Sequence, residues 1–414
     1  MLTRRMQDKG PAKRVAPWTA AWLACCMAAG TAFAETIPSD RSSLAQGRAP
    51  ARVTPRRQWE GPVNPFLGTP RFESQKLFPS GRFPNVVVAA DGGVLAFWGG
   101  VQVRRSEDGG KSWGSPVEVG KGFMGGGVTV DILGGDILAF VEDQHPPAPL
   151  AQFRSRDHGR SWTREQPSIR PNKAGNVPSM HMNEHGITLL HGAYRGRLIR
   201  ASRWYDGKND PAHHPRHYTD AIFSDDGGRS WQASEPFPAM GTGEAAVAEL
   251  SDGRIYYNSR RHWAPPGVNA RRRWTGWSQD GGATWANVAL CEALPDGDQD
   301  RDYGLMGGLV RLPVEGRDIL LFSNIASASG RHHGTVWASF DGGKSWPVRQ
   351  LVTPGAFAYS SLDAGRPGTP AEGWLYLLHE DDTGGTVARF NLGWVVDGEL
   401  TGDGQVPPWA GRRR

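Results

Sequence analysis

An eight-residue pattern, Ser-x-Asp-x-Gly-x-Ser/Thr-Trp, occurs five times in this chain and limits its possible folds more than any other feature. We call each copy a box. The copies are "SEDGGKSW" (106–113), "SRDHGRSW" (155–162), "SDDGGRSW" (224–231), "SQDGGATW" (278–285) and "SFDGGKSW" (339–346). They begin 49, 69, 54 and 61 residues apart, a spacing that suits one four-stranded sheet with variable loops. The repeat therefore predicts a β-propeller in which five blades carry a box.

The residue types of a box suit a tight turn. Ser and Asp side chains can hydrogen-bond to the backbone of the turn, Gly adopts dihedral angles that other residues avoid, and Trp anchors the turn by packing. We therefore predict that the boxes are structural and that their Asp residues take no part in catalysis.

Strand-like runs beside the boxes predict how the blades are built. Apolar or alternating segments at 101–105, 219–223 and 334–338 are expected to be third strands, which the box joins to a fourth. After the last box, "AFAYSSLDAG", "GWLYLLHED" and "TVARFNLGWVV" supply a sixth blade, which a strand near 74–78 would complete. The 55 Gly and 31 Pro also favour short strands and turns. The sequence thus predicts an all-β, six-bladed propeller over 66–400 and a C-terminal tail at 401–414.

The first residues have the pattern of an export signal. Arg4 and Arg5 precede an apolar run from about residue 16 to residue 29, and Ala32 and Ala34 fit the small residues of a cleavage site. We assign 1–34 to a signal peptide and 35–65 to a linker or N-terminal strap. The protein is expected to be periplasmic or secreted, and both the general and the twin-arginine export routes remain open.

Export would remove most of the basic excess. The whole chain has a formal net charge of +5, but residues 1–34 hold five of the 47 Lys and Arg and one of the 42 Asp and Glu, which leaves +1. This balance gives no support for binding to nucleic acid, and no other apolar run is long enough to insert into a membrane after cleavage. Only Cys291 would remain, so no intrachain disulfide is expected. The oligomeric state stays open.

Chain direction assigns the loops to two rims. If the boxes join third and fourth strands on one rim, the loops between second and third strands and those between blades lie on the other rim. That second rim is expected to gather polar residues at strand ends, namely Arg82, Glu244, Arg260, Arg331, Tyr359 and Glu380. Chemistry is expected there.

These residues and their surroundings resemble those of the sialidases, glycoside hydrolases with a six-bladed propeller. The resemblance rests on the boxes, "GRFP" (81–84), "GTGEAAVAELSDGRIYYNSRR" (241–261) and the "AYSSL" and "LLHE" segments, and covers about residues 70–396. It implies that Arg82, Arg260 and Arg331 bind the substrate carboxylate, since guanidinium groups bind carboxylates through paired hydrogen bonds. It also implies that Tyr359 is the nucleophile, Glu244 its base and Glu380 a partner of Arg82.

The chain departs from the family pattern at the proton donor. Sialidases carry an Asp between the second and third strands of the first blade, where this chain has Gly99 and Gly100. A neighbouring loop offers Glu142, Asp143 and His145, of which we assign the role to Asp143. Rim histidines offer another source, because imidazole can act as acid or base near neutral pH; they are His181, His185, His332 and His333.

Three further assignments concern the same rim. His181 and His185 are expected to touch substrate, and Asp131 falls near a family position that lines the pocket. The tract "PAHHPRH" (211–217) has the composition of a metal site but lacks regular ligand spacing, so we predict a solvated loop.

The resemblance implies an enzyme, an exo-glycosidase that needs no cofactor. Its partner would be a glycan, from which it removes a terminal sialic acid or a related 2-keto-3-deoxy sugar acid with retention of configuration. Two alternatives stay open. One is a hydrolase or lyase that acts on another acidic sugar, such as a uronate, through His and Tyr. The other is a non-catalytic glycan-binding propeller.

Overall fold

The structure is a computed structural model in which the chain divides into two compact units, residues 1–56 and 57–414. It describes parts of the second unit only, namely residues 58–99, 101–268, 272–296, 304–397, 399–400 and 406–410. The predicted signal peptide and most of the predicted linker lie outside the described residues. None of the helices in the described ranges is long and apolar enough to cross a membrane.

Six antiparallel sheets make up the described part, one for each predicted blade. Blade 1 contains β2 (Pro84–Val88), β3 (Val94–Trp98), β4 (Gln102–Ser106) and β5 (Val117–Glu118). Blade 2 contains β6 (Phe123–Val130), β7 (Ile137–Glu142), β8 (Leu150–Ser155) and β9 (Thr163–Glu165). Blade 3 contains β11 (Ile187–Thr188), β12 (Leu198–Trp204), β13 (Tyr218–Ser224) and β14 (Trp231–Ala233), with β10 (Ile169–Arg170) added in parallel outside β14.

The second half of the ring follows the same plan. Blade 4 contains β15 (Thr242–Glu249), β16 (Ile255–Arg261), β17 (Arg272–Ser278) and β18 (Ala286–Pro295). Blade 5 contains β19 (Gly308–Arg311), β20 (Leu320–Ile325), β21 (His332–Ser339) and β22 (Val348–Ala356), with β26 (Glu399–Leu400) at its edge. Blade 6 contains β23 (Ser360–Ala364), β24 (Leu375–Asp381), β25 (Gly384–Phe390) and β1 (Phe72–Phe78). The helical pieces are short: η1 (Asn64–Phe66), η2 (Gly192–Tyr194), η3 (His214–Arg216), α1 (Leu392–Val395) and η4 (Pro408–Ala410).

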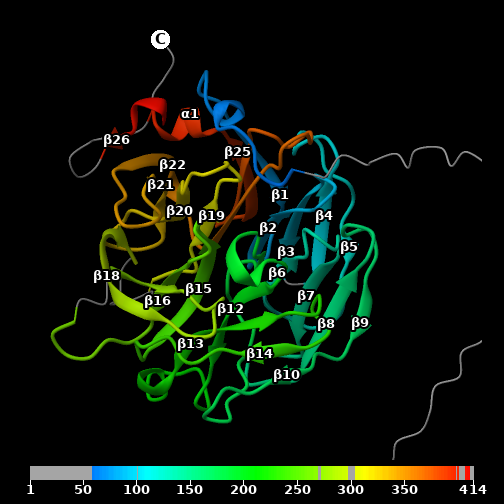
Figure 1. Ribbon diagram of the computed structural model, residues 1–414, viewed down its shortest axis with the longest axis vertical. Coiled ribbons are helices and arrows are strands. Elements are labelled where there is room, and N and C mark those ends of the chain that lie inside the picture. The colour runs from blue at the N-terminus through cyan, green and yellow to red at the C-terminus, as the bar shows by residue number, and fades with distance from the viewer. Residues whose placement is uncertain are drawn as a thin grey trace, which may run out of the picture. The chain divides into compact units, whose positions relative to one another are not determined.

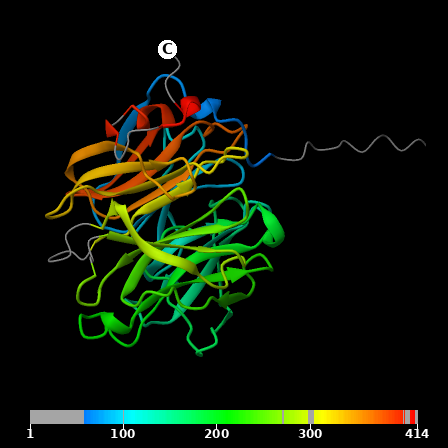
Figure 2. The ribbon, with the colours of Figure 1, turned by 60° about the vertical axis from the view of Figure 1, so that its left-hand side comes forward.

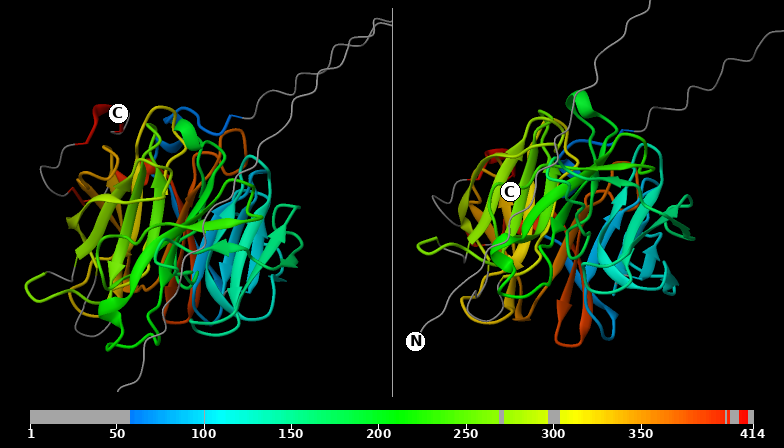
Figure 3. Two further views of the ribbon diagram at one scale, coloured as in Figure 1. Left: turned by 60° about the horizontal axis from the view of Figure 1, so that its bottom comes forward. Right: turned by 90° about the horizontal axis from the view of Figure 1, so that it is seen from below.

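The innermost strands of successive blades contact one another around the ring, and β23 of blade 6 returns to β2 of blade 1. Figure 1 shows the sheets following one another from blue to red around a common centre. Figure 2 brings blades 4 and 5 forward, and Figure 3 shows the strands from the side, running between two rims. The predicted six-bladed, all-β fold is therefore confirmed.

The ring closes through a strand from the beginning of the described chain. β1 pairs antiparallel with β25, with Phe72 opposite Phe390 and Lys76 opposite Thr386. The strand expected near 74–78 is thus the outer strand of blade 6. Because the first strand of the propeller completes the last blade, the ring is held closed by backbone hydrogen bonds rather than by side-chain contacts alone.

Each box is a turn between the third and fourth strands of its blade, and its hydrogen bonds are local. In the first box Ser106 Oγ donates to Asp108 Oδ1 (2.8 Å), and Gly110 N donates to Ser106 Oγ (2.8 Å). The amides of Lys111 and Ser112 donate to Asp108 Oδ1 (3.0 and 2.9 Å). The same bonds recur at Asp157, Asp226, Asp280 and Asp341.

The boxes also join each blade to the one before it. A Cβ at Gly228 of blade 3 would lie 2.2 Å from Leu138 of blade 2, and a Cβ at Gly282 of blade 4 would lie 2.0 Å from Ile199 of blade 3. The corresponding Gly110 of blade 1 meets Tyr376 of blade 6. These glycines are needed because the neighbouring blade approaches the turn more closely than a side chain would allow. The predicted structural role thus extends between blades.

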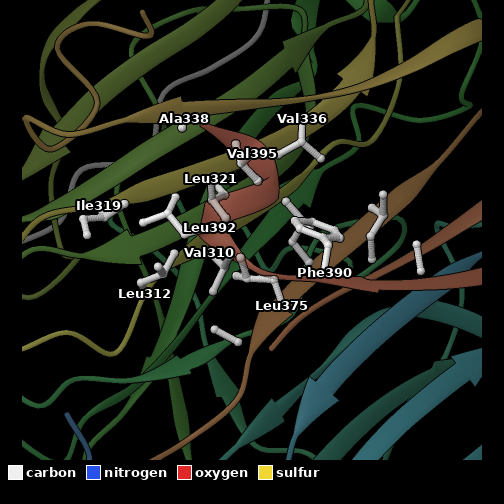
Figure 4. Packing of buried hydrophobic residues seen from close by; sticks show 14 of the residues in the cluster. Val310, Leu312, Ile319, Leu321, Val336, Ala338, Leu375, Phe390, Leu392 and Val395 are labelled. Atoms are coloured by element: carbon white, nitrogen blue, oxygen red, sulfur yellow. The ribbon is translucent and has the colours of Figure 1, made fainter. Parts of the chain in front are cut away.

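The hydrophobic core lies between the blades. Strands such as β3 and β7 are buried along their whole length because both faces of each sheet pack against another sheet, so their sequences are continuous apolar runs. Figure 4 shows the cluster between blades 5 and 6, where Leu321 and Val336 meet Leu375 and Phe390 beneath Leu392 of α1.

The described ends of the unit pack on the propeller. Gly61, in the predicted strap, bridges to Val314, and Glu60 accepts from Arg311 and contacts His191. In the predicted tail, Trp409 packs against Phe340, and Arg317 Cζ lies 3.9 Å from the centroid of the Trp409 ring. Residues 401–405 and 411–414 of that tail lie outside the described residues.

Candidate active site

The rim opposite the boxes brings together six of the residues expected at strand ends. Arg82 precedes β2, Glu244 lies at the start of β15 and Arg260 near the end of β16. Arg331 precedes β21, Tyr359 precedes β23 and Glu380 lies near the end of β24. Segments of three blades, 4 to 6, and the loop before blade 1 therefore converge on one place, as the two-rim prediction requires.

A buried triplet of Tyr359, Glu244 and Arg260 forms the base of the site. The Tyr359 hydroxyl donates to Glu244 Oε1 (3.1 Å) and accepts from Arg260 Nη1 (3.2 Å). Arg260 Nη1 also donates to Glu244 Oε2 (2.5 Å). The three residues are only 7%, 3% and 4% exposed. A phenol held between a carboxylate and a guanidinium can lose its proton to the first while the second stabilises the oxygen.

Two more guanidinium groups face the ring of Tyr359. The Cζ atoms of Arg82 and Arg331 lie 5.0 and 5.3 Å from the ring centroid. Together with Arg260 they place three positive charges around one phenol, in a geometry suited to binding a carboxylate above the ring.

Glu380 fixes Arg82 from below. Its oxygens accept from Arg82 Nε (3.2 Å) and Nη2 (3.0 Å) and from the amide of Phe83 (2.9 Å). Its own amide donates to Tyr359 O (2.9 Å), so the same residue orients the arginine and the tyrosine segment. Phe83 has φ of 76°, a left-handed conformation that costs energy for a residue with a side chain and is tolerated at functional sites.

The protonation states follow from burial and charge. Burial raises the pKa of Tyr359, and Glu244 raises it further, against the opposing effect of the three arginines, so the phenol is neutral at rest. Burial alone would raise the pKa of Glu244, but Arg260 and Arg203 more than offset this and hold it below the ordinary value. The pair is therefore a neutral phenol beside an ionised carboxylate.

An open cleft adjoins this cluster on the side of blades 5 and 6. It has a volume of about 620 Å³ and is lined by Arg82, Arg331 and Glu380 together with Asp381 and Asp382. A separate, narrower cavity lies at the other end of the axis, between Val130, Glu249, Arg311 and the strap residue Glu60. Of these two cavities, the first is the one lined by the site arginines Arg82 and Arg331.

The described residues show no contact between Asp143 and the cluster. Asp143 begins the β7–β8 loop, is exposed, and its side chain has no hydrogen-bond partner among the described residues. Gly99 N donates to Arg82 O (2.8 Å), so the short turn of blade 1 passes beside Arg82 without an acidic side chain. Glu142, the neighbour of Asp143, is 1% exposed, and burial raises its pKa to about 7, but its contacts are with Ser179 and Met180.

The other expected residues divide between the site and elsewhere. His181 lies at the site, with its ring 6.3 Å from that of Phe83 and 4.4 Å from that of His145. His185 lies deeper along the axis, where Nε2 meets Leu362 O (2.8 Å) and the residue lines the far cavity. Asp131 is misplaced by the sequence interpretation. It caps the β6–β7 turn on the box rim by accepting from the amide of Gly134 (2.8 Å).

Sequence reasoning missed a wall of histidines that borders the site on the side of blades 2 to 4. The tract 211–217, predicted to be solvated, contributes His214 and His217, which are 8% and 0% exposed. They pack with Tyr205 and His262, and His262 Nε2 lies 3.8 Å from Glu244 Oε1. The prediction was wrong because Arg203 lies beneath this loop and holds it by hydrogen bonds, a contact that composition alone cannot reveal.

Within the described ranges, no group of three or more His, Cys, Asp or Glu side chains is placed to hold a metal ion. That statement includes the histidine wall, whose rings are packed against one another and against Tyr205.

Comparisons with known proteins identify the family of the chain. Residues 96–369 match the family described as BNR repeat-like domain. A sialidase of Micromonospora viridifaciens is 29% identical over 392 residues, covering 83% of this chain and 58% of that protein. A sialidase of Vibrio cholerae is 28% identical over 228 residues, covering 46% of this chain and 27% of that protein. The chain thus spans little more than half the length of the first relative.

Solved structures show the same fold. A Hadza microbial sialidase superimposes with a TM-score of 0.60 at 24% identity, covering 76% of this chain and 66% of that one. An intramolecular trans-sialidase from Ruminococcus gnavus gives a TM-score of 0.57 at 14% identity, covering 82% of this chain and 98% of that one. At these identities the likeness concerns the arrangement of the blades.

Proposed function

The chain belongs to the BNR repeat-like domain family of the sialidase superfamily, and on that basis we propose that it is a retaining exo-glycosidase. Its substrate would be a glycan that ends in a sialic acid or a related 2-keto-3-deoxy sugar acid. The observation that carries the proposal is the hydrogen bond of 3.1 Å between the Tyr359 hydroxyl and Glu244 Oε1, inside a ring of three arginines.

The arginines explain why the nucleophile is a phenol. A sugar acid of this class carries a carboxylate on the reacting carbon, which Arg82, Arg260 and Arg331 would hold directly over Tyr359. The substrate carboxylate would repel a carboxylate nucleophile, whereas it does not repel a neutral phenol. Sialidases are known exceptions to the two-carboxylate mechanism of glycoside hydrolysis for this reason.

In the proposed first step the Tyr359 oxygen attacks the anomeric carbon while its proton passes to Glu244 Oε1. The bond to the leaving oxygen breaks, and Arg260 stabilises the tyrosine oxygen as charge develops. In the second step water attacks the same carbon from the face that the leaving group vacated. The bond to Tyr359 breaks, Tyr359 recovers its proton from Glu244, and the proton of the water goes to the released oxygen or to solvent. Two displacements give net retention.

The absence of a carboxyl group beside the blade 1 turn limits the leaving groups. With Gly99 next to Arg82 and Asp143 exposed, a poor leaving oxygen has no carboxyl donor at this turn, and the imidazole of His181 is left as a candidate at the site. A leaving group of low pKa departs without such help. The proposed activity is therefore expected to be greatest on substrates with aryl or similarly acidic leaving groups.

The test is the release of the fluorescent aglycone from an aryl sialoside by the purified protein between pH 4 and 8. Release by the wild type, reduced by about two or more orders of magnitude in Tyr359→Phe, is the expected result. The matched control is Tyr376→Phe, which changes a buried tyrosine at a box contact outside the site.

The result also decides between the alternatives. No release at any pH by folded wild type would overturn the assignment to sialosides, and aryl uronides would then be tested in the same assay. Binding of a sialoside that Tyr359→Phe leaves unchanged, with no turnover by the wild type, would identify a glycan-binding propeller instead.

A further inference from the structure

Arg203 occupies the same place in blade 3 that Arg260 occupies in blade 4. Each is the sixth residue of the second strand of its blade, β12 for Arg203 and β16 for Arg260. Both residues therefore lie near the strand end at the site rim. Arg203 is 1% exposed, and its backbone pairs with Ser179 in both directions (2.8 and 3.0 Å). The site thus has a fourth arginine, the second that is buried, which the sequence interpretation did not include.

Gly243 shows how close Arg203 comes to the base Glu244. A Cβ at Gly243 would lie 2.2 Å from the ring of His262 and 3.5 Å from Arg203 Cζ. The residue next to Glu244 must therefore lack a side chain for His262 and Arg203 to pack there. This packing places Arg203 Cζ beside the residue that precedes Glu244.

The guanidinium of Arg203 can only donate, so its bonds set the direction of every other bond in the wall. It donates to Tyr205 OH (3.2 Å), to Asn209 Oδ1 (3.3 Å) and to His217 Nδ1 (3.1 Å). His217 must then carry its proton on Nε2. The amide of Asn209 must turn its oxygen toward Arg203 and its nitrogen away.

Asn209 passes this order to two more histidines. His214 Nε2 lies 3.1 Å from Asn209 Oδ1 and must donate to it, whereas Asn209 Nδ2 donates to His145 Nε2 (3.1 Å). His145 then carries its proton on Nδ1, which donates to Pro146 O (3.0 Å). One arginine thereby determines which nitrogen is protonated in three neutral imidazole rings.

Burial and neighbouring charge keep these rings neutral. Burial, assisted by Arg203, lowers the pKa of His214 to about 4 and that of His217 to about 3. Burial and Arg203 likewise place the pKa of His262 well below its ordinary value. Near neutral pH these rings are therefore uncharged, and Arg203 supplies the positive charge of the wall.

We propose that Arg203 is a positioning residue of the site, which holds Glu244 ionised from blade 3 as Arg260 does from blade 4 and which fixes the tautomers of His145, His214 and His217. The role in catalysis rests on the proposed function, whereas the tautomers and the charge state do not. Titratable and charged groups from several elements face Glu244. The strands supply Arg260 from β16, His262 just after β16 and Arg203 from β12. The segments before strands and the loops supply the others, namely His181, Tyr359, Arg82, His145 and His214.

The direct test uses nuclear magnetic resonance on protein labelled in histidine nitrogen and glutamate carboxyl carbon. Glu244 is assigned with Glu244→Gln, and the ring nitrogens with His145→Gln, His214→Gln and His217→Gln. Arg203→Met is expected to raise the pKa of Glu244 and to mix the two tautomers of His217. Arg203→Lys keeps the charge without the planar set of donors, so it should restore the Glu244 titration but not the His217 tautomer.

Arg197→Met is the matched control. Arg197 precedes the same strand, is 9% exposed and pairs with Asp225 near the box rim. Its loss is expected to lower stability without altering the Glu244 titration or the histidine tautomers. Should Arg203→Met fold poorly, the comparison of Arg203→Lys with wild type still decides the tautomer part, and Arg203→Gln decides the charge part.

Activity adds a second readout. If the aryl sialoside is hydrolysed, the acid limb of the pH profile should move upward in Arg203→Met, so that the loss of kcat/KM is greater at pH 5 than at pH 8. Unchanged Glu244 titration and unchanged histidine tautomers in a folded Arg203→Met would overturn the proposal. A wild type without turnover would reject the proposed function alone, because the resonance measurements need no substrate.

Discussion

The two rims of the propeller use carboxylates in opposite ways. On the box rim, Asp226 takes its hydrogen bonds from Ser224, Arg229 and Ser230, all within four residues in the chain. On the other rim, Glu244 meets Tyr359 across 115 residues and Glu380 meets Arg82 across 298. A carboxylate satisfied by its own turn stabilises that turn wherever it is repeated. A carboxylate satisfied by distant strands exists only once, after the ring has formed.

The largest difference between the rims should appear in turnover. Glu244→Gln keeps the shape of the site but removes the proton acceptor, so kcat on an aryl sialoside should fall by about 10²- to 10⁴-fold. Asp226→Asn makes the same chemical change in a box and should leave kcat within about twofold, since it alters no residue near Tyr359. A comparable loss of kcat in both folded variants would remove the distinction.

The converse difference should appear in the free energy of unfolding. Asp226→Ala removes four local hydrogen bonds and is expected to cost about 1–2 kcal/mol. Glu292→Ala, which changes a surface carboxylate with a side chain 74% exposed, should cost less than about 0.5 kcal/mol. Urea unfolding of both variants measures the contrast, and equal costs would show that the box bonds add nothing.

A smaller effect is expected at Glu380, which orients rather than reacts. Glu380→Gln keeps an acceptor for Arg82 but loses the charge, a change of about 1 kcal/mol that corresponds to about a fivefold rise in KM. Because Tyr359 and Glu244 are untouched, kcat should change less than KM. Steady-state kinetics separate the two constants, and a fall confined to kcat would place Glu380 in the reacting group instead.

The smallest effect concerns acid stability of the boxes. Burial alone would raise the pKa of Asp157 and Asp226. Hydrogen bonds from Ser side chains and backbone amides outweigh burial and lower both pKa values to about 2. A lowered folded-state pKa gives stability that is present above the unfolded value and is lost as pH falls toward 2. The stability advantage of wild type over Asp226→Asn should therefore shrink between about pH 4 and pH 2, by less than about 1 kcal/mol at this half-exposed position. A constant difference would contradict this.

The fold could be predicted because its signal is repeated and local. The residues of each box predict a turn, and the spacing of the boxes predicts the size of a blade. The number of strands then requires a strand from the N-terminal region, β1, to close the ring. The grouping of Tyr359 with Glu244 and three arginines was also expected, because all of them lie at strand ends whose rim follows from chain direction. The structure places them within hydrogen-bonding or ring-stacking distance.

What the sequence could not reveal depends on contacts between blades. Asp131 was assigned to the wrong rim because a turn aspartate and a strand-end aspartate look alike in a Gly-rich segment. Arg203 was not singled out, and the histidines of 211–217 were predicted to be solvated, because nothing local indicates the hydrogen bond between Arg203 and His217 or the room that Gly243 leaves for Arg203 and His262. A useful signal was available in retrospect, since Arg203 and Arg260 have the same position in successive second strands.

The contact of each box with the preceding blade gives the ring an order of assembly. As the chain emerges from the ribosome, the boxes of blades 2 to 5 can each find the blade already made. The first box cannot, because Tyr376 donates to Gly109 O from 267 residues further on, and β1 must likewise wait for β25. The part of the propeller that is synthesised first is thus the last to find its hydrogen-bond partners. Until blade 6 arrives, the chain would carry an unpaired strand and an open edge, the state in which aggregation or proteolysis competes with folding.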